Sequence, residues 1–242
     1  EIGIFDFLFG TLWRPANDLY GILPMIVGSI YVTAGALVIG VPIGILTAVF
    51  MARFCPPWLY KIMKPATNLM AGIPSVVYGF FGLVILVPFV RDTFGGRGMS
   101  VLTASILLGL MILPTIISMS EASIRAVPQS YYEGGLALGA SHERSVFFTV
   151  VPAAKSGIFA SVVLGVGRAI GETMAVMMVA GNQTVIPEKI TDGVRTLTTN
   201  IVMEMGYSTD LHREALIATA VVLFVFILII NLSFSLLKRR SK

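Results

Sequence analysis

The chain has 242 residues, of which 56% are hydrophobic and only 12% are charged, and its mean hydropathy is +0.88. So few charged side chains cannot cover the surface of a water-soluble fold of this size, which excludes a soluble globular domain. The formal net charge of +4 is typical of a membrane protein with basic loops on one side, and it gives no reason to expect nucleic-acid binding.

Residues 1–18 form a short segment with aromatic side chains of the kind that anchor at a membrane interface, namely Phe5, Phe7, Phe9 and Trp13. We expect this segment to be extracytoplasmic and residues 19–242 to form a transmembrane domain.

Five stretches of this domain are long and apolar enough to cross a hydrocarbon core of about 30 Å as helices. They are residues 19–52, 65–90, 99–120, 156–181 and 215–237. Several contain Gly and Pro, which neighbouring helices make tolerable inside a membrane. The sequence therefore predicts an all-α fold, a polytopic bundle of five membrane-spanning helices in a lipid bilayer.

The basic residues predict the orientation of this bundle. Placing the tail 238–242 in the cytoplasm makes the loops 53–64 and 121–155 cytoplasmic too, and these three regions hold ten of the 17 lysines and arginines. The opposite side holds six, against nine aspartates and glutamates. With five spans, residue 1 is then extracytoplasmic.

The start of the chain and its cysteine content add two expectations. The chain begins without Met, and its first twenty residues lack the pattern of a signal peptide, so we expect at least one earlier helix to precede it. The single Cys55 excludes an internal disulfide and is expected to be structural.

Two longer polar stretches remain, 121–155 on the cytoplasmic side and 182–214 on the extracytoplasmic side. In the first, Pro128 suits a first helical turn, and the residues up to Gly139 place apolar groups on one side before a second helix begins. Two short helices set at an angle form a knob that can lie in a groove of another protein.

This inner stretch resembles the E-A-A-x3-G-x9-I-x-L-P loop of bacterial ABC importer permeases. Glu133, Gly139 and Pro152 match at the correct spacing, whereas positions 149 and 151 differ, and Gly134 and Gly135 replace the two alanines. Glycine there should loosen the helix by about 0.5–1 kcal/mol per site. The resemblance implies a MetI-like permease of a type I importer, in which 121–155 is the coupling loop and these five residues face an ATPase subunit. The alternative is an amphipathic interfacial linker.

A second resemblance covers roughly residues 20–237. The runs IPSVVYG at 73–79 and GRAIGETMAV at 167–176 are similar to permeases of phosphate-specific (Pst) importers. The C-terminal part is more similar to their PstC type than to their PstA type, on Leu211, His212, Ala215, Leu216, Leu223, Phe224, Val225 and Asn231. The resemblance implies the bacterial inner membrane, a PstA-like second permease, two PstB-like ATPase subunits that bind ATP and Mg, and a periplasmic phosphate-binding protein.

The residues of 156–181 themselves indicate an anion site. Arg168 lies about 20 Å along this helix from Lys155, and a charge at that depth is costly unless it is paired or hydrated. Glu172 at i+4 is expected on the same helical face, paired with Arg168, with the hydroxyl of Thr173 nearby. We therefore assign these three residues to the substrate pathway. The alternative is a salt bridge that only fixes helix packing.

A guanidinium offers bidentate donors to a phosphate, and a neighbouring carboxylate can accept a hydrogen bond from a protonated phosphate but repels fully ionised sulfate. Catalytic motifs and metal clusters are not recognisable: the spacing Gly165-x-Gly167-x3-Gly171 suits helix packing better than a dinucleotide, no P-loop is present, and His142 and His212 are expected on opposite sides. We expect neither catalysis nor a cofactor or metal in this chain, with ATP hydrolysis in a separate subunit.

These features together predict a permease subunit of an ATP-driven ABC importer for inorganic phosphate. The alternatives are a permease for another oxyanion, such as molybdate or sulfate, and a membrane scaffold or sensor that carries nothing.

Overall fold

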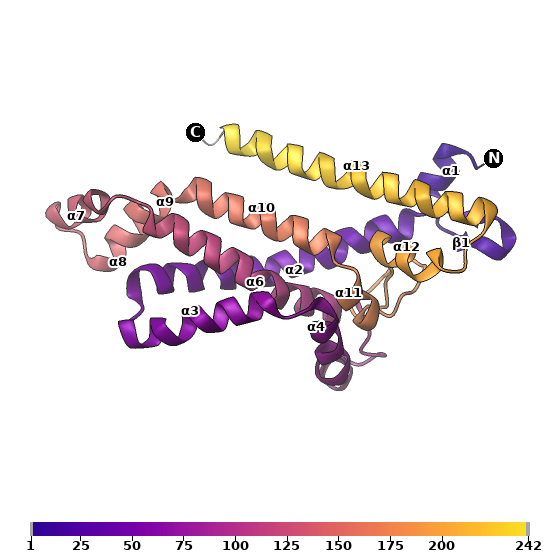
Figure 1. The fold of residues 1–242 in the computed structure, drawn as a ribbon, viewed down its shortest axis with the longest axis horizontal. Helices are drawn as coiled ribbons and strands as arrows, with labels where there is room; N and C mark the ends of the chain where they lie inside the picture. The colour runs from indigo at the N-terminus through magenta and orange to yellow at the C-terminus, as the bar shows by residue number, and fades with distance from the viewer. Residues whose placement is uncertain (1, 241–242) are drawn as a thin grey trace.

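The chain forms an elongated bundle of helices in the computed structural model, which describes residues 2–240 and the side chains of residues 2–233 (Figure 1). Glu1, Ser241 and Lys242, and the side chains of the basic tail 238–242, lie outside the described residues. The elements in chain order are α1 (Ile4–Phe9), β1 (Trp13–Arg14), η1 (Pro15–Asn17), β2 (Leu19–Tyr20), α2 (Leu23–Val49), η2 (Phe50–Phe54), α3 (Pro57–Gly72), α4 (Ser75–Phe81), η3 (Gly82–Leu86), α5 (Val87–Phe94), α6 (Val101–Arg125), α7 (Gln129–Ala137), α8 (His142–Ser145), η4 (Val146–Val150), α9 (Val151–Ala153), α10 (Lys155–Gly171), α11 (Met174–Val179), α12 (Leu197–Met205) and α13 (Asp210–Arg240).

The predicted all-helical membrane fold is confirmed. Within the described residues, four helices are long and apolar enough to span a membrane, and a fifth span is reached when the pair α8–α9 and α10, bent by 68°, is counted as one. The four are Leu23–Phe54, Ser75–Phe94, Val101–Arg125 and Asp210–Ser233.

The segment between α2 and α6 differs from its prediction. The expected loop 53–64 is wrong, because α3 already begins at Pro57, where a proline costs no helical hydrogen bond. The predicted span 65–90 is present with other bounds, Ser75–Phe94, because Pro74 disfavours the helical conformation at Ile73, which is extended with ψ 126°. The stretch from α4 to α5 is seen nearly end-on in Figure 1, so it runs across the bundle rather than along it.

Helices α2 and α6 form the centre of the bundle, and small residues let them approach closely. A Cβ on Gly40 would lie 2.9 Å from the Gly109 carbonyl oxygen, and one on Gly44 would lie 2.7 Å from the Ile116 side chain. In a membrane, where lipid is as apolar as the core, such close packing is the main attraction between helices. Many side chains of α6 are buried in the core, and the end of α10 packs against this helix.

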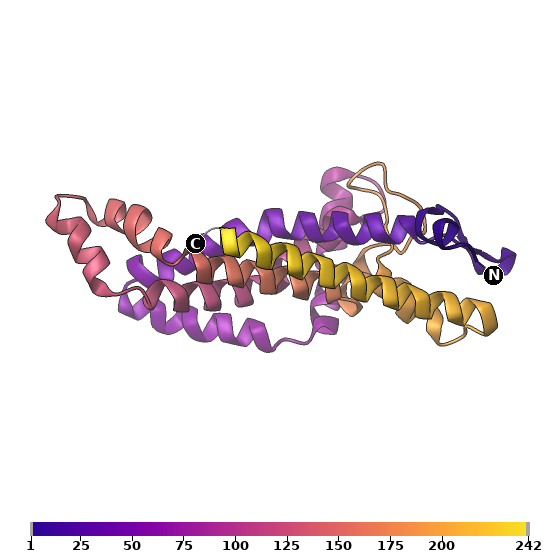
Figure 2. The same cartoon turned by 90° about the horizontal axis from the view of Figure 1, so that it is seen from above.

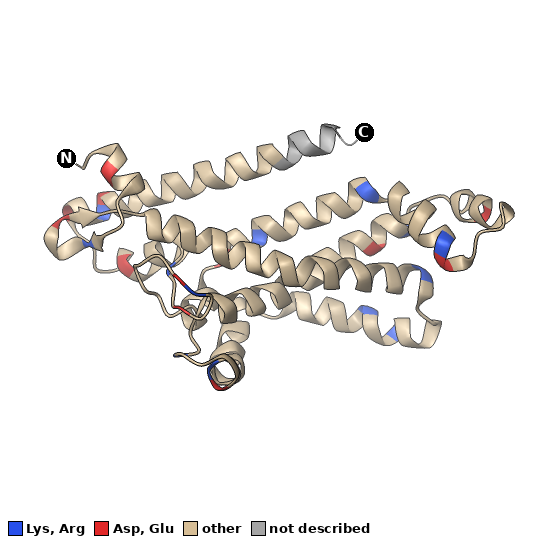
Figure 3. Ribbon diagram, turned by 180° about the vertical axis from the view of Figure 1, so that it is seen from behind, with Lys and Arg blue, Asp and Glu red and all other residues tan. Residues whose placement is uncertain are grey.

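The two ends of the bundle carry different elements. Helices α7, α8 and α9 lie at one end, toward which α13 runs, whereas α1, the β1–β2 hairpin and α12 lie at the other (Figure 1, Figure 2). Charged residues gather at the two ends and are sparse along the helices between them (Figure 3). We call the end with α7 the knob end and the end with α12 the hairpin end.

Candidate functional site

Arg168 lies in the last turn of α10, at the end of this helix remote from α7 and α8. Its side chain is half-buried, and Nη1 donates a hydrogen bond to Thr115 Oγ1 of α6 at 3.2 Å. Tyr78 of α4 lies close enough to interact with the guanidinium electrostatically. The bond to Thr115 is the one hydrogen bond of the guanidinium within the described residues, so most of its five donors remain for an anion.

Glu172 lies just beyond α10 and is not paired with Arg168. The helix ends at Gly171, and the backbone at Glu172 is extended, with φ −71° and ψ 130°. Its Oε1 accepts a hydrogen bond from Ala175 N at 3.1 Å, and its carbonyl oxygen accepts one from Thr198 Oγ1 at 3.1 Å. The expected i,i+4 ion pair is wrong, since the described residues contain no hydrogen bond or ion pair between Glu172 and the arginine.

The physical reason is a competition between the Glu172 carboxylate and the helix. A carboxylate that bonds a backbone N–H a few residues ahead favours a new helix start over continuation of the old helix. The span predicted at 156–181 is therefore two helices, α10 and α11, separated at residues 172–173. We call these two residues the α10 break.

Thr173 completes the α10 break. Its backbone leaves the helical region, with φ −120° and ψ −58°, and its hydroxyl donates to the Gly171 carbonyl oxygen at 3.4 Å. The three residues that the sequence assigns to the substrate pathway thus lie together at one end of α10. They form the last turn and the break of a helix rather than one face of a continuous helix.

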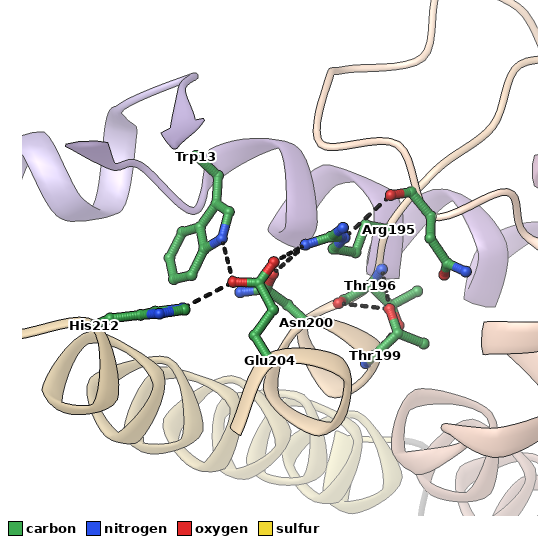
Figure 4. A network of polar contacts seen from close by, with 8 residues as sticks. Trp13, Arg195, Thr196, Thr199, Asn200, Glu204 and His212 are labelled. Atoms are coloured by element: carbon green, nitrogen blue, oxygen red, sulfur yellow. Dashed lines mark hydrogen bonds and ion pairs between the residues drawn. The ribbon is translucent and has the colours of Figure 1, made fainter. Parts of the chain in front are cut away.

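A buried polar cluster at the hairpin end surrounds the carboxylate of Glu204, which is only 6% exposed (Figure 4). Trp13 Nε1 donates to Glu204 Oε2 at 2.8 Å, and His212 Nε2 lies 2.9 Å from the same oxygen. Arg195 Nη1 donates to Glu204 Oε1 and to Asn200 Oδ1, the latter at 3.0 Å. We call these five residues the outer cluster.

Sequence reasoning missed the outer cluster, because its members come from four segments: β1, the loop before α12, α12 itself and α13. Arg195 and Glu204 stand in a stretch that has the composition of an exposed loop, so nothing in the sequence indicates their burial. The sequence draws attention to His212 only through the resemblance to PstC-type permeases and as a candidate for a metal or catalytic site shared with His142. The described residues contain no group of three or more His, Cys, Asp or Glu that could hold a metal.

At the knob end, α7 and α8 form the predicted pair of short helices. Glu133 is exposed on α7, and Gly139 turns the chain toward α8 with φ +82°, a conformation that glycine adopts without strain. Tyr132 Oη lies 2.8 Å from His142 Nδ1, and the His142 ring packs edge-on against Phe54, with the ring centroids 4.8 Å apart. The knob is therefore anchored to the end of η2, the segment that continues α2.

The two glycines that replace alanine have different surroundings. A Cβ on Gly134 would meet no atom within 4 Å, whereas one on Gly135 would lie 2.7 Å from Ser145 Oγ of α8. Gly135 thus lets α7 and α8 touch, and Gly134 faces open space. Pro152 is exposed on α9, between the knob and α10.

A second missed cluster holds α3 to α6 near the knob end. The carboxylate of Glu121 is 1% exposed and accepts hydrogen bonds from Tyr60 Oη and Lys64 Nζ at 2.7 Å and from Arg125 Nε at 2.8 Å. Arg125 Nη2 also donates to the Met51 carbonyl oxygen at 2.7 Å. The hydrogen bond to this carboxylate raises the pKa of the Tyr60 hydroxyl, and burial raises it further. We call Tyr60, Lys64, Glu121 and Arg125 the inner cluster.

Comparisons with known proteins place this geometry among transporter subunits. Residues 40–242 match the family described as "Binding-protein-dependent transport system inner membrane component". The chain is 43% identical to the probable ABC transporter permease protein YqgH of Bacillus subtilis over 93% of its own length and 76% of that protein. It is 33% identical to the phosphate transport system permease protein PstC of Mesorhizobium japonicum over the same shares. In fold it is similar to a chain of the MetNI methionine ABC transporter in inward-facing conformations, with a TM-score of 0.68, 20% identity, and coverage of 92% of this chain and 94% of that one.

Proposed function

Because this chain belongs to the family of binding-protein-dependent transport system inner membrane components, we propose that it is a permease subunit of an ATP-driven importer for inorganic phosphate. It is a multi-pass inner-membrane protein of this family. Several relatives that cover most of the chain are named phosphate transport system permease PstC, at 30–34% identity. Their name supports phosphate as the cargo.

The observation that carries the proposal is the position of α10, which connects the knob to the anion site. Its first residue, Lys155, lies one residue beyond the end of α9, and its last turn holds Arg168, about 20 Å away along the helix axis. A displacement of the knob therefore moves the guanidinium, since a helix of 17 residues transmits motion as a rigid element. The knob meets α10 at a bend of 68° between α8–α9 and α10, so a push on the knob along its own helices acts on the first turn of α10 from the side.

The chemistry at the end of α10 suits phosphate. Arg168 carries a guanidinium, whose planar donors match two oxygens of a tetrahedral anion. The Glu172 carboxylate uses Oε1 for Ala175 N, which leaves Oε2 without a hydrogen bond in the described structure. We infer that this oxygen accepts a hydrogen bond from the hydroxyl of a protonated phosphate and disfavours sulfate, which has no proton to donate.

We expect the other components to lie outside this chain. A homologous permease faces this one across the pathway, and two cytoplasmic ATPase subunits bind ATP and Mg and receive the α7–α8 knobs, with Glu133 and Pro152 at the contact. A periplasmic phosphate-binding protein docks at the hairpin end. In this orientation the knob end is cytoplasmic, as the distribution of lysine and arginine along the sequence predicts.

Uptake of labelled phosphate into proteoliposomes that contain the complete complex, with its binding protein, tests the proposal. We expect uptake that requires ATP and is not inhibited by excess sulfate or molybdate. Inhibition by sulfate or by molybdate would favour that oxyanion as the cargo instead of phosphate. Absence of any ATP-dependent uptake by a correctly assembled complex would contradict transport and favour the scaffold or sensor alternative.

A further inference from the structure

We propose that Thr198 and the outer cluster are positioning elements for the anion site, because they fix the α10 break from the hairpin end. This inference rests on the proposed function, since it assigns a role within the same transport cycle. In the described contacts, Thr198 bonds neither Arg168 nor a residue of the outer cluster. It belongs to α12, the helix that also contributes residues to the outer cluster. Two separate connections lead from the outer cluster to Glu172.

The first connection runs through α12. This helix begins with a capping box formed by Thr196 and Thr199, so its first turn is rigid. Thr198 lies in that turn, is 7% exposed, and donates its hydroxyl proton to the Glu172 carbonyl oxygen at 3.1 Å. This carbonyl belongs to an extended residue and has no helical partner, so Thr198 supplies its hydrogen bond. Further along the same helix, α12 contributes Asn200, about half a turn beyond Thr198, and Glu204, between one and two turns beyond it, to the outer cluster.

The second connection runs through α11. The side chain of Asn182 caps its C-terminal end by donating Nδ2 to the Met177 carbonyl oxygen at 2.7 Å. Arg195 of the outer cluster donates Nε to the Asn182 carbonyl oxygen at 3.1 Å. The N-terminal end of α11 is held by the Glu172 carboxylate through Ala175 N. This six-residue helix therefore connects the outer cluster at one end with the α10 break at the other.

The outer cluster is suited to hold α11 and α12 in a fixed position relative to the N-terminal hairpin. The Glu204 carboxylate is almost completely buried and has three donors, and removing one partner of such a buried charge leaves the others uncompensated. Trp13 ties the N-terminal hairpin into the same network. Any displacement of α12 or α11 relative to the hairpin is therefore transmitted to Glu172 rather than absorbed within the cluster.

The test compares two buried threonines in the reconstituted complex. Thr198→Val removes the hydroxyl that holds Glu172, whereas the control Thr219→Val removes another buried hydroxyl, one of α13 that bonds the Ala215 carbonyl oxygen at 2.8 Å. We expect Thr198→Val to lower the rate of phosphate uptake about fivefold, the size of one net hydrogen bond. The ATP hydrolysis stimulated by the binding protein should stay near that of the unmodified complex, as should both activities in the control.

A double-mutant cycle separates positioning from simple structural support. In a Glu172→Gln background the charge that Thr198 positions is already gone, so adding Thr198→Val should cost little more, whereas independent structural defects would multiply. Thr198→Ser, which keeps the hydroxyl, should restore uptake. Asn182→Gly tests the second connection independently, because glycine tolerates the φ of +53° at this position while losing the bond to Met177.

The outcomes distinguish this inference from the proposed function. Uptake by the unmodified complex together with multiplicative losses in the cycle, or equal losses in Thr198→Val and Thr219→Val, would overturn the positioning role alone. If the complex with Thr198→Val does not assemble, the same double-mutant cycle is carried out with Asn182→Gly and Glu172→Gln, and its result decides the positioning role. Failure of the unmodified complex to take up phosphate would overturn the proposed function, and this inference with it.

Discussion

At the scale of residues, we expect transport to depend on Arg168, a cation that lies among apolar helices. Arg168 has one hydrogen bond from a half-buried guanidinium, so its charge is incompletely compensated by the described residues. Placing such a charge inside a membrane costs free energy, so a functional role explains its presence better than a packing role does. The absence of a salt bridge to Glu172 strengthens this interpretation, because a pair that served only to hold helices together would be closed.

The first prediction distinguishes bidentate recognition from simple charge. Arg168→Lys keeps the positive charge and can keep a bond to Thr115, but it loses the planar fork. We expect phosphate uptake to fall about tenfold or more, because a point charge cannot bind two oxygens in fixed geometry. Uptake rates in proteoliposomes measure the effect. The exposed Arg14→Lys serves as the control and should leave uptake unchanged, whereas normal uptake by Arg168→Lys would contradict the assigned role.

The second prediction concerns the inner cluster and the stability of the subunit. Glu121→Gln removes the charge from a carboxylate with three donors and leaves Lys64 and Arg125 without their partner. We expect a loss of about 2 kcal/mol, limited by the partial exposure of both cations, which lets water solvate them.

Thermal unfolding of the purified complex measures this loss. Asp92→Asn, which breaks an exposed pair with Arg91, should change the stability little. Equal effects of the two substitutions would show that burial of Glu121 is energetically irrelevant.

At the scale of elements, the sequence predicted the helices well and their breaks poorly. Apolar length alone places α2, α6 and α13, because each carries enough consecutive hydrophobic residues to cross a bilayer. The breaks at Pro74 and at Glu172 depend on local competition for backbone hydrogen bonds, which hydropathy does not register. Arg168 and Glu172 were singled out because a charge in an apolar stretch is conspicuous, and their role in the substrate pathway stays a prediction. The partners of Glu204 and Glu121 were not, because long-range pairing leaves no pattern in one sequence.

The third prediction concerns the two glycines of α7. Gly134→Ala places a methyl group in open space and should stabilise the helix by about 0.5–1 kcal/mol, because alanine has the higher helix propensity. Gly135→Ala should have the opposite effect, since its methyl group would meet Ser145 at the contact between α7 and α8.

Hydrogen exchange of the amides of 129–145 reports on this local stability. The pair Gly135→Ala and Ser145→Ala tests the cause, because Ser145 Oγ is buried and has no hydrogen-bond partner among the described residues. Removing this oxygen should recover part of the protection. Slower exchange in Gly135→Ala alone would contradict the expected clash.

At the scale of the whole molecule, the bundle separates two tasks along its length. The knob end presents short helices with an exposed carboxylate and an adjoining inner cluster that fastens α3 to α6. The hairpin end carries the buried outer cluster and connects through α11 and α12 to the α10 break. Arg168 lies in the last turn of α10 beside that break, so under the proposed function movements of both ends would reach this helix terminus. This arrangement requires that the two ends face opposite sides of the membrane.

The last prediction tests that requirement directly, and the single cysteine of the chain makes it practical. In a Cys55→Ser background, Leu138→Cys labels the knob end, where Leu138 is 91% exposed, and Tyr207→Cys labels the hairpin end, where Tyr207 is 68% exposed. A membrane-impermeant maleimide added to intact spheroplasts should modify Tyr207→Cys at once and Leu138→Cys only after permeabilisation, because the lysines and arginines of 53–64 and 121–155 favour a cytoplasmic knob. The cysteine-free parent controls for background, and full denaturation in detergent controls for shielding of the knob by a bound ATPase subunit. The reverse labelling pattern would place the knob outside the cell, where no ATPase could reach it, and would therefore contradict the coupling of α10 to ATP hydrolysis.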